Sequence, residues 1–281
     1  MKIGIIGAGR VGSTSAFCIA REGIVDEIIL IDLNSGLAIG EAEDINQGLI
    51  LFPKETIVKA GGYKELSDCN LIIITAGLRR KEGETRLDLI NKNLSLIADI
   101  VKNITSNNKN CLLFVVSNPV DIMTYLALKT SGFAKERVFG LGTYLDTIRL
   151  KSIIKRDGKD PNDAMIVGEH GDSMVAVSYS DDEIIERTRK AGAEMIKNKG
   201  GAGWAVGMAC LEIVKAIVFD KKGVFPLSSF ISEYEICISI PTIIGKDGII
   251  GYPKISLTKE EREKFINSTR VIKEQIASLN L

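Results

Sequence analysis

The first twelve residues constrain the fold of this chain more strongly than any other stretch. A β-branched run at residues 3–6 leads into a glycine-rich loop with the spacing G-x-G-x-x-G, and a segment of helical spacing follows at residues 12–22. The loop consists of Gly7, Ala8, Gly9, Arg10, Val11 and Gly12. A strand, loop and helix of this kind predict a βαβ unit that binds a pyrophosphate at the helix N-terminus. We therefore expect all six loop residues to contact a dinucleotide.

The carboxylate that follows the next β-branched run indicates which dinucleotide is bound. That run covers residues 27–31 and ends in Asp32. A carboxylate here can accept hydrogen bonds from both ribose hydroxyls and repels a 2′-phosphate. Leu33 and Asn34 supply no cation that would hold such a phosphate. We predict NAD as the cofactor, and the alternative is an ordinary turn with a surface aspartate.

The first half of the chain alternates strand-like and helix-like segments. Apolar strand-like runs lie at residues 3–6, 27–31, 71–75 and 111–116, and helical spacing at residues 12–22, 37–49 and 86–106. This alternation predicts an α/β fold with a Rossmann-type doubly wound parallel sheet. Ligands bind at the carboxyl ends of such strands, so the turns at residues 7–12, 32, 76–77 and 117–118 should lie along one crevice.

The second half has a mixed pattern that predicts an α+β substrate lobe. We expect helices at residues 145–155, 182–199 and 204–219, and strands at residues 164–167, 174–179, 224–231 and 235–240. A final helix should begin at Thr258, whose hydroxyl can form a capping box with Glu261. The boundary lies near residue 140. Residues 1–140 would form the dinucleotide-binding domain and residues 141–281 the substrate domain.

Charge and cysteine content exclude several classes of function. Lys+Arg and Asp+Glu both number 36, so no net field attracts nucleic acid or an anionic membrane surface. The chain begins directly with a predicted strand, and it contains no apolar run of membrane-spanning length. Its five cysteines are widely spaced, which favours buried reduced thiols over a zinc site or disulfides. We expect a cytoplasmic protein without a metal.

Three side chains in the second half are of the types needed to transfer a proton to or from a substrate that carries a carboxylate. His170 is the only histidine and stands between Gly168 and Gly171, directly after a predicted strand. An imidazole is well matched to proton transfer near neutral pH. Asp146 and Arg149 share one helix face, so Asp146 can orient the imidazole while Arg149 binds a carboxylate. The alternatives are a structural histidine and a surface ion pair.

A basic segment follows the turn after residue 75. Residues 78–86 read LRRKEGETR and include one glycine. Such a segment is either a solvated loop or a lid that brings arginines over a bound anion and excludes water. Because the chain has no net charge, basic side chains concentrated here indicate an anionic small molecule as ligand.

These segments together resemble the lactate/malate dehydrogenase family over essentially the whole chain. The matching stretches are residues 7–12, 32, 75–77, 81–88, 93, 116–120, 145–149, 168–173 and 199–200. Within the family, the chain looks most like the lactate-dehydrogenase-like malate dehydrogenases of archaea and bacteria. The resemblance implies an NAD-dependent 2-hydroxyacid dehydrogenase that assembles as a homodimer or homotetramer.

The resemblance also assigns roles to individual residues. It makes His170 the general acid/base, Asp146 its orienting partner and Arg149 the ligand of the C1 carboxylate. Arg86 would polarise the C2 oxygen, and Asn118 would contact the substrate oxygen and the nicotinamide ribose. The remaining residues implied to line the cofactor are Thr75, Gly77, Asn93 and Val116.

One position in the basic segment governs substrate choice in this family, and here it is Arg80. A neutral residue at this position accompanies lactate, whereas arginine accompanies malate because a dicarboxylate brings a second negative charge that must be paired. The opposing slot should be small, which Gly201 and Ala202 satisfy. The resemblance therefore favours (S)-malate and oxaloacetate. The alternatives are a lactate dehydrogenase or other 2-ketoacid reductase, and a non-catalytic NAD-binding protein.

The chain departs from the family pattern at a few places. Glu82 replaces a usual proline, and Gly203 and Trp204 stand where a pair of aromatic residues is common. Residues 142–145 look more like the lactate branch, and the stretch between His170 and Gly200 is about ten residues shorter than usual. These differences leave the shape of the substrate pocket and the assembly open.

Overall fold

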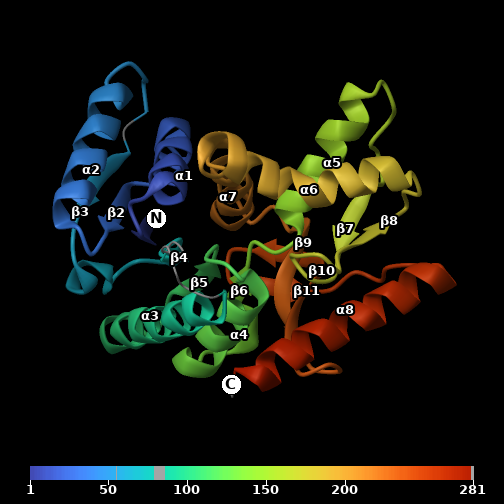
Figure 1. Cartoon of the computed structure of the whole chain (residues 1–281). Coiled ribbons are helices and arrows are strands. Elements are labelled where there is room, and N and C mark those ends of the chain that lie inside the picture. Colours follow the sequence, from blue (N-terminus) through green and yellow to red (C-terminus); the bar gives the residue numbers. More distant parts are fainter. Residues whose placement is uncertain (55, 79–85, 280–281) are drawn as a thin grey trace.

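The architecture is a long mixed sheet covered by helices on both faces (Figure 1). The computed structural model describes residues 1–54, 56–78 and 86–279, and the side chains of these residues except 86–89. The described strands of the main sheet run in the order β11-β10-β9-β6-β5-β4-β1-β2-β3. Their bounds are β1 (Lys2–Ile6), β2 (Glu27–Ile31), β3 (Ile57–Ala60), β4 (Leu71–Ile74), β5 (Leu112–Val115), β6 (Val138–Gly140), β9 (Gly223–Ile231), β10 (Ile236–Gly245) and β11 (Gly248–Gly251).

Strands from the first half pair in parallel, as a doubly wound sheet requires. In the register of β1, Ile3 lies opposite Ile28 of β2 and Leu71 of β4. Strands β4 and β5 are buried along their whole length, which explains their unbroken apolar sequences. The predicted Rossmann-type α/β sheet is confirmed.

Strands from the second half extend the same sheet with antiparallel pairing. The connection is a single pair between β6 and β9, Gly140 with Ser228. Strands β9, β10 and β11 then form a meander. A separate hairpin of β7 (Met165–Val167) and β8 (Val175–Val177) makes the second sheet. The sheet therefore continues across residue 140.

The helices divide between the two faces of the sheet. Helices α1 (Arg10–Glu22), α2 (Ser35–Leu49) and α7 (Trp204–Val218) pack on one face, and α3 (Arg86–Asn107), α4 (Val120–Ser131) and α8 (Lys259–Ser278) on the other (Figure 1). Helices α5 (Tyr144–Arg156) and α6 (Asp182–Lys199) enclose a third apolar cluster with the β7–β8 hairpin. Short 3₁₀ helices, η1 (Tyr63–Leu66) and η2 (Lys135–Arg137), complete the elements.

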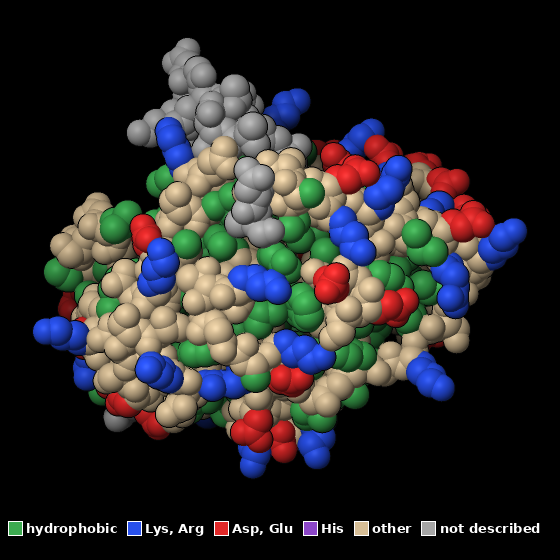
Figure 2. Space-filling model, turned by 90° about the horizontal axis from the view of Figure 1, so that it is seen from below, with side chains coloured by type: hydrophobic (Ala, Val, Ile, Leu, Met, Phe, Trp, Pro, Cys, Tyr) green, Lys and Arg blue, Asp and Glu red, His purple; other side chains and the backbone are tan. Residues whose placement is uncertain are grey.

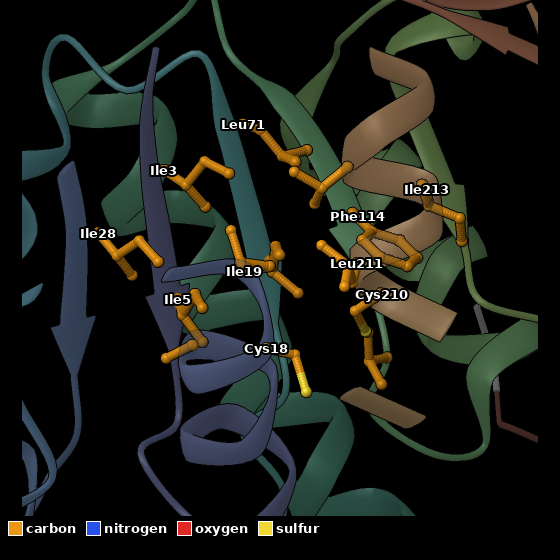
Figure 3. Packing of buried hydrophobic residues seen from close by; sticks show 14 of the residues in the cluster. Ile3, Ile5, Cys18, Ile19, Ile28, Leu71, Phe114, Cys210, Leu211 and Ile213 are labelled. Carbon is orange, nitrogen blue, oxygen red and sulfur yellow. The ribbon is translucent and has the colours of Figure 1, made fainter. Parts of the chain in front are cut away.

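Helix α7 joins the second half of the chain to the dinucleotide-binding half. Figure 3 shows Leu211 and Ile213 of α7 in the same buried cluster as Ile3 of β1 and Ile19 of α1. A Cβ atom on Gly207 of α7 would lie only 2.8 Å from Thr14 Cγ2. The two helices therefore approach closely, and residues distant in sequence share one core.

Most predicted elements are present with shifts of one or two residues at their ends. The helix at residues 182–199 is found with its predicted bounds, and the capping box at Thr258 is confirmed. Strand β10 runs beyond its predicted end, to Gly245. The predictions omitted β3, β6, α4 and β11. Three of these are strands of three or four residues, and most residues of α4 are buried, including the polar Asp121 and Thr124, so its sequence gives little helical periodicity.

The predicted burial of the thiols is confirmed. All five cysteines are buried and unpaired, and burial raises the pKa of Cys69 and of Cys210 to about 12. None of the helices in the described part of the chain is long and apolar enough to cross a bilayer. Basic and acidic side chains are interspersed on the face shown in Figure 2, in keeping with the balanced charge.

Candidate active site

The glycine-rich loop after β1 is shaped so that only glycine fits two of its positions. Gly7 has a φ of +101°, and a Cβ atom there would lie 2.7 Å from the backbone nitrogen of Ala76. A Cβ on Gly12 would lie 1.8 Å from the carbonyl oxygen of Gly7. Gly9 differs, because no atom lies within 4 Å of its Cβ position, and it caps α1 without a side-chain hydrogen bond. The helix N-terminus at Gly9 is thus free to receive a phosphate group, and the loop fits a dinucleotide.

Asp32 is fixed against this loop by backbone hydrogen bonds. Its Oδ2 accepts a hydrogen bond from the backbone N–H of Ala8 at 2.8 Å, and its Oδ1 accepts one from the N–H of Asn34 at 2.9 Å. Each carboxylate oxygen retains a further lone pair for a ribose hydroxyl. The predicted ribose ligand therefore stands beside the predicted phosphate loop.

Other turns at the carboxyl ends of the parallel strands meet at the same place, as expected. Thr75 donates its hydroxyl to the carbonyl of Gly7 at 2.8 Å, so it braces the loop. Asn93 is buried, and its Oδ1 accepts a hydrogen bond from the N–H of Leu78 at 2.7 Å. Gly77 packs near the same amide oxygen. The structure thus gives Thr75 and Asn93 supporting contacts within the protein.

Arg10 makes a contact that the loop motif did not indicate. Its Nη1 donates to the carbonyl of Lys199 at 2.5 Å and to that of Gly201 at 2.8 Å. Gly203, the N-cap of α7, also packs against its side chain. The guanidinium therefore fastens the start of α1 to the turn between α6 and α7. No local sequence signal reveals this partner, because Arg10 and Lys199 are 189 residues apart in the sequence.

The three acid/base and carboxylate-binding candidates lie in direct contact. Nδ1 of His170 lies 2.5 Å from Oδ2 of Asp146, and Nη1 of Arg149 donates to Oδ1 of the same carboxylate at 2.9 Å. The Asp146 side chain is 1% exposed, whereas those of His170 and Arg149 are each 17% exposed. Asp146 is therefore a buried anchor, and its two partners reach the solvent-accessible side.

Pairing of opposite charges outweighs burial in setting the pKa values of His170 and Asp146. Burial alone would lower the pKa of His170, but the charge of Asp146 and the hydrogen bond to it raise that pKa above its ordinary 6.5. Burial also opposes ionisation of Asp146, but His170 and Arg149 lower the pKa of Asp146 below its ordinary value. An ionised Asp146 thus favours the protonated imidazole with Nδ1 as the donor, which leaves Nε2 free for proton exchange with a ligand.

A pocket of about 330 Å³ opens beside these residues. Its described lining includes His170, Arg149, Asn118 and Val116, together with Val11 of the glycine-rich loop. The rest of the lining is mainly small or apolar: Val120, Leu141, Gly142, Leu145, Gly192, Ile196, Gly201, Ala202 and Val206. Of these described lining residues, only Arg149 carries a permanent positive charge. The pocket can therefore receive a small acid beside a dinucleotide, with its carboxylate on Arg149.

Two other predicted contacts fall outside what the structure describes. Arg80 lies outside the described residues, and the side chain of Arg86, the first residue of α3, is likewise not described. The small slot predicted at Gly201 and Ala202 is present in the pocket wall. Trp204 is 66% exposed and does not belong to the described lining of the pocket.

Several residues that shape the site make contacts that the sequence did not predict. Gly168 has a φ of +91° and pairs with Ser239 of β10, which holds the loop that carries His170. Ser239 also accepts a hydrogen bond from the N–H of Thr143. Gly192 and Ile196 of α6 also line the pocket. All of these depend on contacts between distant segments.

A histidine paired with a buried carboxylate beside a dinucleotide-binding loop fits the chemistry of NAD-dependent dehydrogenases. An arginine in the same pocket fits a substrate that carries a carboxylate. Sequence comparison agrees. Residues 1–140 match the family model described as lactate/malate dehydrogenase, NAD binding domain, and residues 178–280 match its alpha/beta C-terminal domain. The chain belongs to the lactate/malate dehydrogenase family.

Individual relatives come from both branches of the family. An L-lactate dehydrogenase of Clostridium botulinum (strain Loch Maree) is 38% identical over 97% of this chain and 95% of its own length. One from Clostridium perfringens (strain SM101) is 39% identical over 100% and 98%. The crystallised malate dehydrogenase of Archaeoglobus fulgidus, in complex with NADH, is 38% identical, covers 100% of both chains and has a TM-score of 0.94. A lactate dehydrogenase from a deep-sea metagenome has the same TM-score at 33% identity, with coverage of 100% and 99%.

Proposed function

We propose that this enzyme is a malate dehydrogenase, which interconverts (S)-malate and oxaloacetate with NAD. The contact between His170, Asp146 and Arg149 at the mouth of one pocket supports the acid/base half of the proposal. Arg80 supports the choice of a dicarboxylate. The domain boundary at residue 140 would then divide the work, with the dinucleotide on residues 1–140 and most substrate contacts on residues 141–281.

His170 acts as the general acid/base in this proposal. In malate oxidation Nε2 takes the proton of the C2 hydroxyl, and in oxaloacetate reduction it returns that proton. Asp146 keeps Nδ1 protonated and stabilises the imidazolium that forms. Bound NAD supplies the hydride acceptor, and NADH the donor. Because Asp146 is buried and held by Arg149 as well, the imidazole has one favoured orientation.

The substrate is held by a small number of polar groups within an apolar pocket. Arg149 binds the C1 carboxylate, and Asn118 contacts the C2 oxygen and the nicotinamide ribose. Arg86 stabilises negative charge that develops on the C2 oxygen during reduction. We further propose that Gly7, Ala8, Gly9, Arg10, Val11, Gly12, Asp32, Thr75, Gly77, Asn93, Val116 and Asn118 surround the dinucleotide.

Recognition of the second carboxylate of malate requires a second cation. Among the described lining residues Arg149 is the single permanent cation, so a dicarboxylate needs a partner from outside them. An unpaired carboxylate in an apolar pocket is strongly disfavoured, at several kcal/mol. Arg80 stands at the family position that supplies this charge. Lactate is the second candidate, because the curated relatives at 38–39% identity are named L-lactate dehydrogenases.

A side-by-side assay tests the substrate. We expect wild-type kcat/KM for NADH-dependent reduction to be higher with oxaloacetate than with pyruvate. Arg80→Gln should move the ratio toward pyruvate by about 10²-fold or more, since it leaves the second carboxylate unpaired. Arg79→Gln, at the neighbouring arginine, is the matched control and should leave the ratio near its wild-type value. A wild-type enzyme that already prefers pyruvate would make the malate assignment wrong and leave lactate in its place.

A further inference from the structure

A second buried carboxylate, Asp121, lies directly behind the candidate acid/base. Asp121 belongs to the first turn of α4 and is 4% exposed. Its Oδ2 accepts a hydrogen bond from the backbone N–H of His170 at 2.8 Å. Its Oδ1 accepts a hydrogen bond from Ser228 Oγ at 2.6 Å. One carboxylate thus joins α4, the loop that carries His170 and strand β9.

A buried carboxylate at this position costs free energy unless its negative charge stabilises a positive charge nearby. An asparagine of the same shape could accept from the His170 N–H and donate to the Ser228 hydroxyl without burying a charge. Burial raises the pKa of Asp121 to about 6, against the hydrogen bonds from Ser228 and His170 that favour ionisation. Above that pH the site holds an anion next to the loop of His170.

The titratable groups around Asp121 identify which charge it can stabilise. Asp121 is faced by His170 and Glu169 of the loop and by Cys237 of β10. Lys129, further along α4, faces Cys237. His170 itself is faced by Asp146, Asp121 and Arg149. Among the groups facing Asp121, only the imidazole can become positive, so its protonation is what a negative Asp121 favours.

The position of Asp121 in the chain links it to the dinucleotide side of the pocket. Val120, its neighbour, and Asn118 both line the pocket. The same turn of chain therefore forms part of the pocket wall and holds the main chain of His170 from behind. That loop is also held by the pairing of Gly168 with Ser239 of β10 and by the hydrogen bond from the N–H of Glu169 to Ser268 Oγ.

We propose that Asp121 is a positioning residue for His170, which fixes the main chain of the histidine through its N–H and favours the protonated imidazole through its negative charge. This inference rests on the proposed acid/base role of His170 and deepens it. The effect of the hydrogen bond and the effect of the negative charge can be separated by substitution. Asp121→Asn keeps the acceptor and removes the charge, whereas Asp121→Ala removes both.

The test of the charge is a titration of the imidazole. His170 is the only histidine in the chain, so the histidine signals in an NMR pH titration of protein labelled at histidine report this residue alone. We expect Asp121→Asn to lower the pKa of His170 by about half a unit or more relative to wild type. Ser229→Ala is the control, because Ser229 is a buried neighbour of Ser228 whose hydroxyl contacts Leu227 and Thr242 instead. It should titrate like wild type.

The test of the hydrogen bond is the turnover number. Asp121→Ala should lower kcat by about tenfold, because the His170 loop loses an anchor and leaves an N–H unpaired. Asp121→Asn, assayed at its own pH optimum, should stay within about threefold of wild type. If Asp121→Ala does not fold, the NMR titration of His170 in Asp121→Asn alone tests the proposal.

An unchanged His170 titration in Asp121→Asn would overturn the electrostatic part, and wild-type kcat in a folded Asp121→Ala would overturn the positioning part. The titration needs no substrate, so its result is independent of whether His170 is the acid/base. Failure of that role would instead appear as turnover that survives replacement of His170.

Discussion

The ionisation of His170 determines how the rate of each direction of the proposed reaction should depend on pH. Its pKa is raised above 6.5, since Asp146 outweighs the effect of burial. A raised pKa means that the imidazole stays protonated to a higher pH, which suits reduction, where it donates a proton. Oxidation requires the neutral imidazole, so its rate should increase above that pKa.

Opposite pH profiles are therefore expected for the two directions. As pH rises through the pKa of His170, kcat/KM for oxaloacetate reduction should fall while that for malate oxidation should rise. His170→Asn should lower kcat by about 10²- to 10⁴-fold in both directions and abolish this pH dependence. Steady-state assays across the pH range measure both effects, with NADH binding followed by fluorescence as the control for an intact cofactor site. Undiminished turnover in the variant would favour an NAD-binding protein whose histidine is structural.

Residue types and spacing were enough to predict the acid/base group before any coordinates. His170, Asp146 and Arg149 each stand in a distinctive local pattern, and the structure brings them into contact. Asp121 and Ser239 could not be found in this way. Their partners lie on other elements, and a buried Asp or Ser in an apolar run has no local pattern that marks it.

At the scale of elements, α6 illustrates how a helix can be adapted to the site that it borders. Gly192 lies in the interior of α6, where glycine is less favourable than alanine. A Cβ atom there would lie 3.4 Å from Arg149 Nη1 and 3.7 Å from its Cζ, so it would rest on the guanidinium. The glycine therefore leaves open a part of the pocket beside Arg149.

Gly192→Ala should thus separate stability from substrate affinity. We expect the variant to be more stable by about 0.5–1 kcal/mol, which thermal unfolding can measure. Its KM for the 2-oxo acid should rise about tenfold, because the added methyl group occupies pocket volume. Gly40→Ala is the matched control, since Gly40 lies in α2 with no atom within 4 Å of its Cβ position. An equal KM in the two variants would mean that Gly192 does not shape the pocket.

The elements themselves were predicted best where one face is apolar and the other polar. The ends of α6 and the cap of α8 were correct, because charged faces and capping residues mark them. Helix α4 was missed, since it is buried on nearly all sides and lacks an amphipathic pattern. Short strands such as β6 were missed because three residues give no periodicity, and their pairing is decided by neighbours across the sheet.

The whole molecule depends on contacts that join its two halves on both sides of residue 140. Helix α7 packs on α1, β9 pairs with β6, and Arg10 binds the turn between α6 and α7. That turn contributes Gly201 and Ala202 to the pocket. The geometry of the substrate pocket is therefore coupled to the helix that opens the dinucleotide loop.

Removal of the Arg10 side chain tests this coupling. Arg10→Ala should raise KM for the 2-oxo acid about fivefold, corresponding to about 1 kcal/mol for the lost hydrogen bonds at a partly exposed site. Arg21→Ala, on the same helix but paired with Glu22 at the surface, should have the wild-type KM. Steady-state kinetics with both variants compares them. Equal KM values would show that the turn is held in place without Arg10.

The order of strands in the main sheet also determines which strands lie at its two edges. Its longest apolar strands lie in the interior, and the outermost strands, β3 and β11, are only four residues each. Strand β3 places Lys59 in its centre, and β11 begins and ends with glycine. Short edge strands that carry a charge or glycines offer few free backbone groups to which another chain could add a strand. The two edge strands are therefore poor templates for edge-to-edge pairing with a second copy of the sheet.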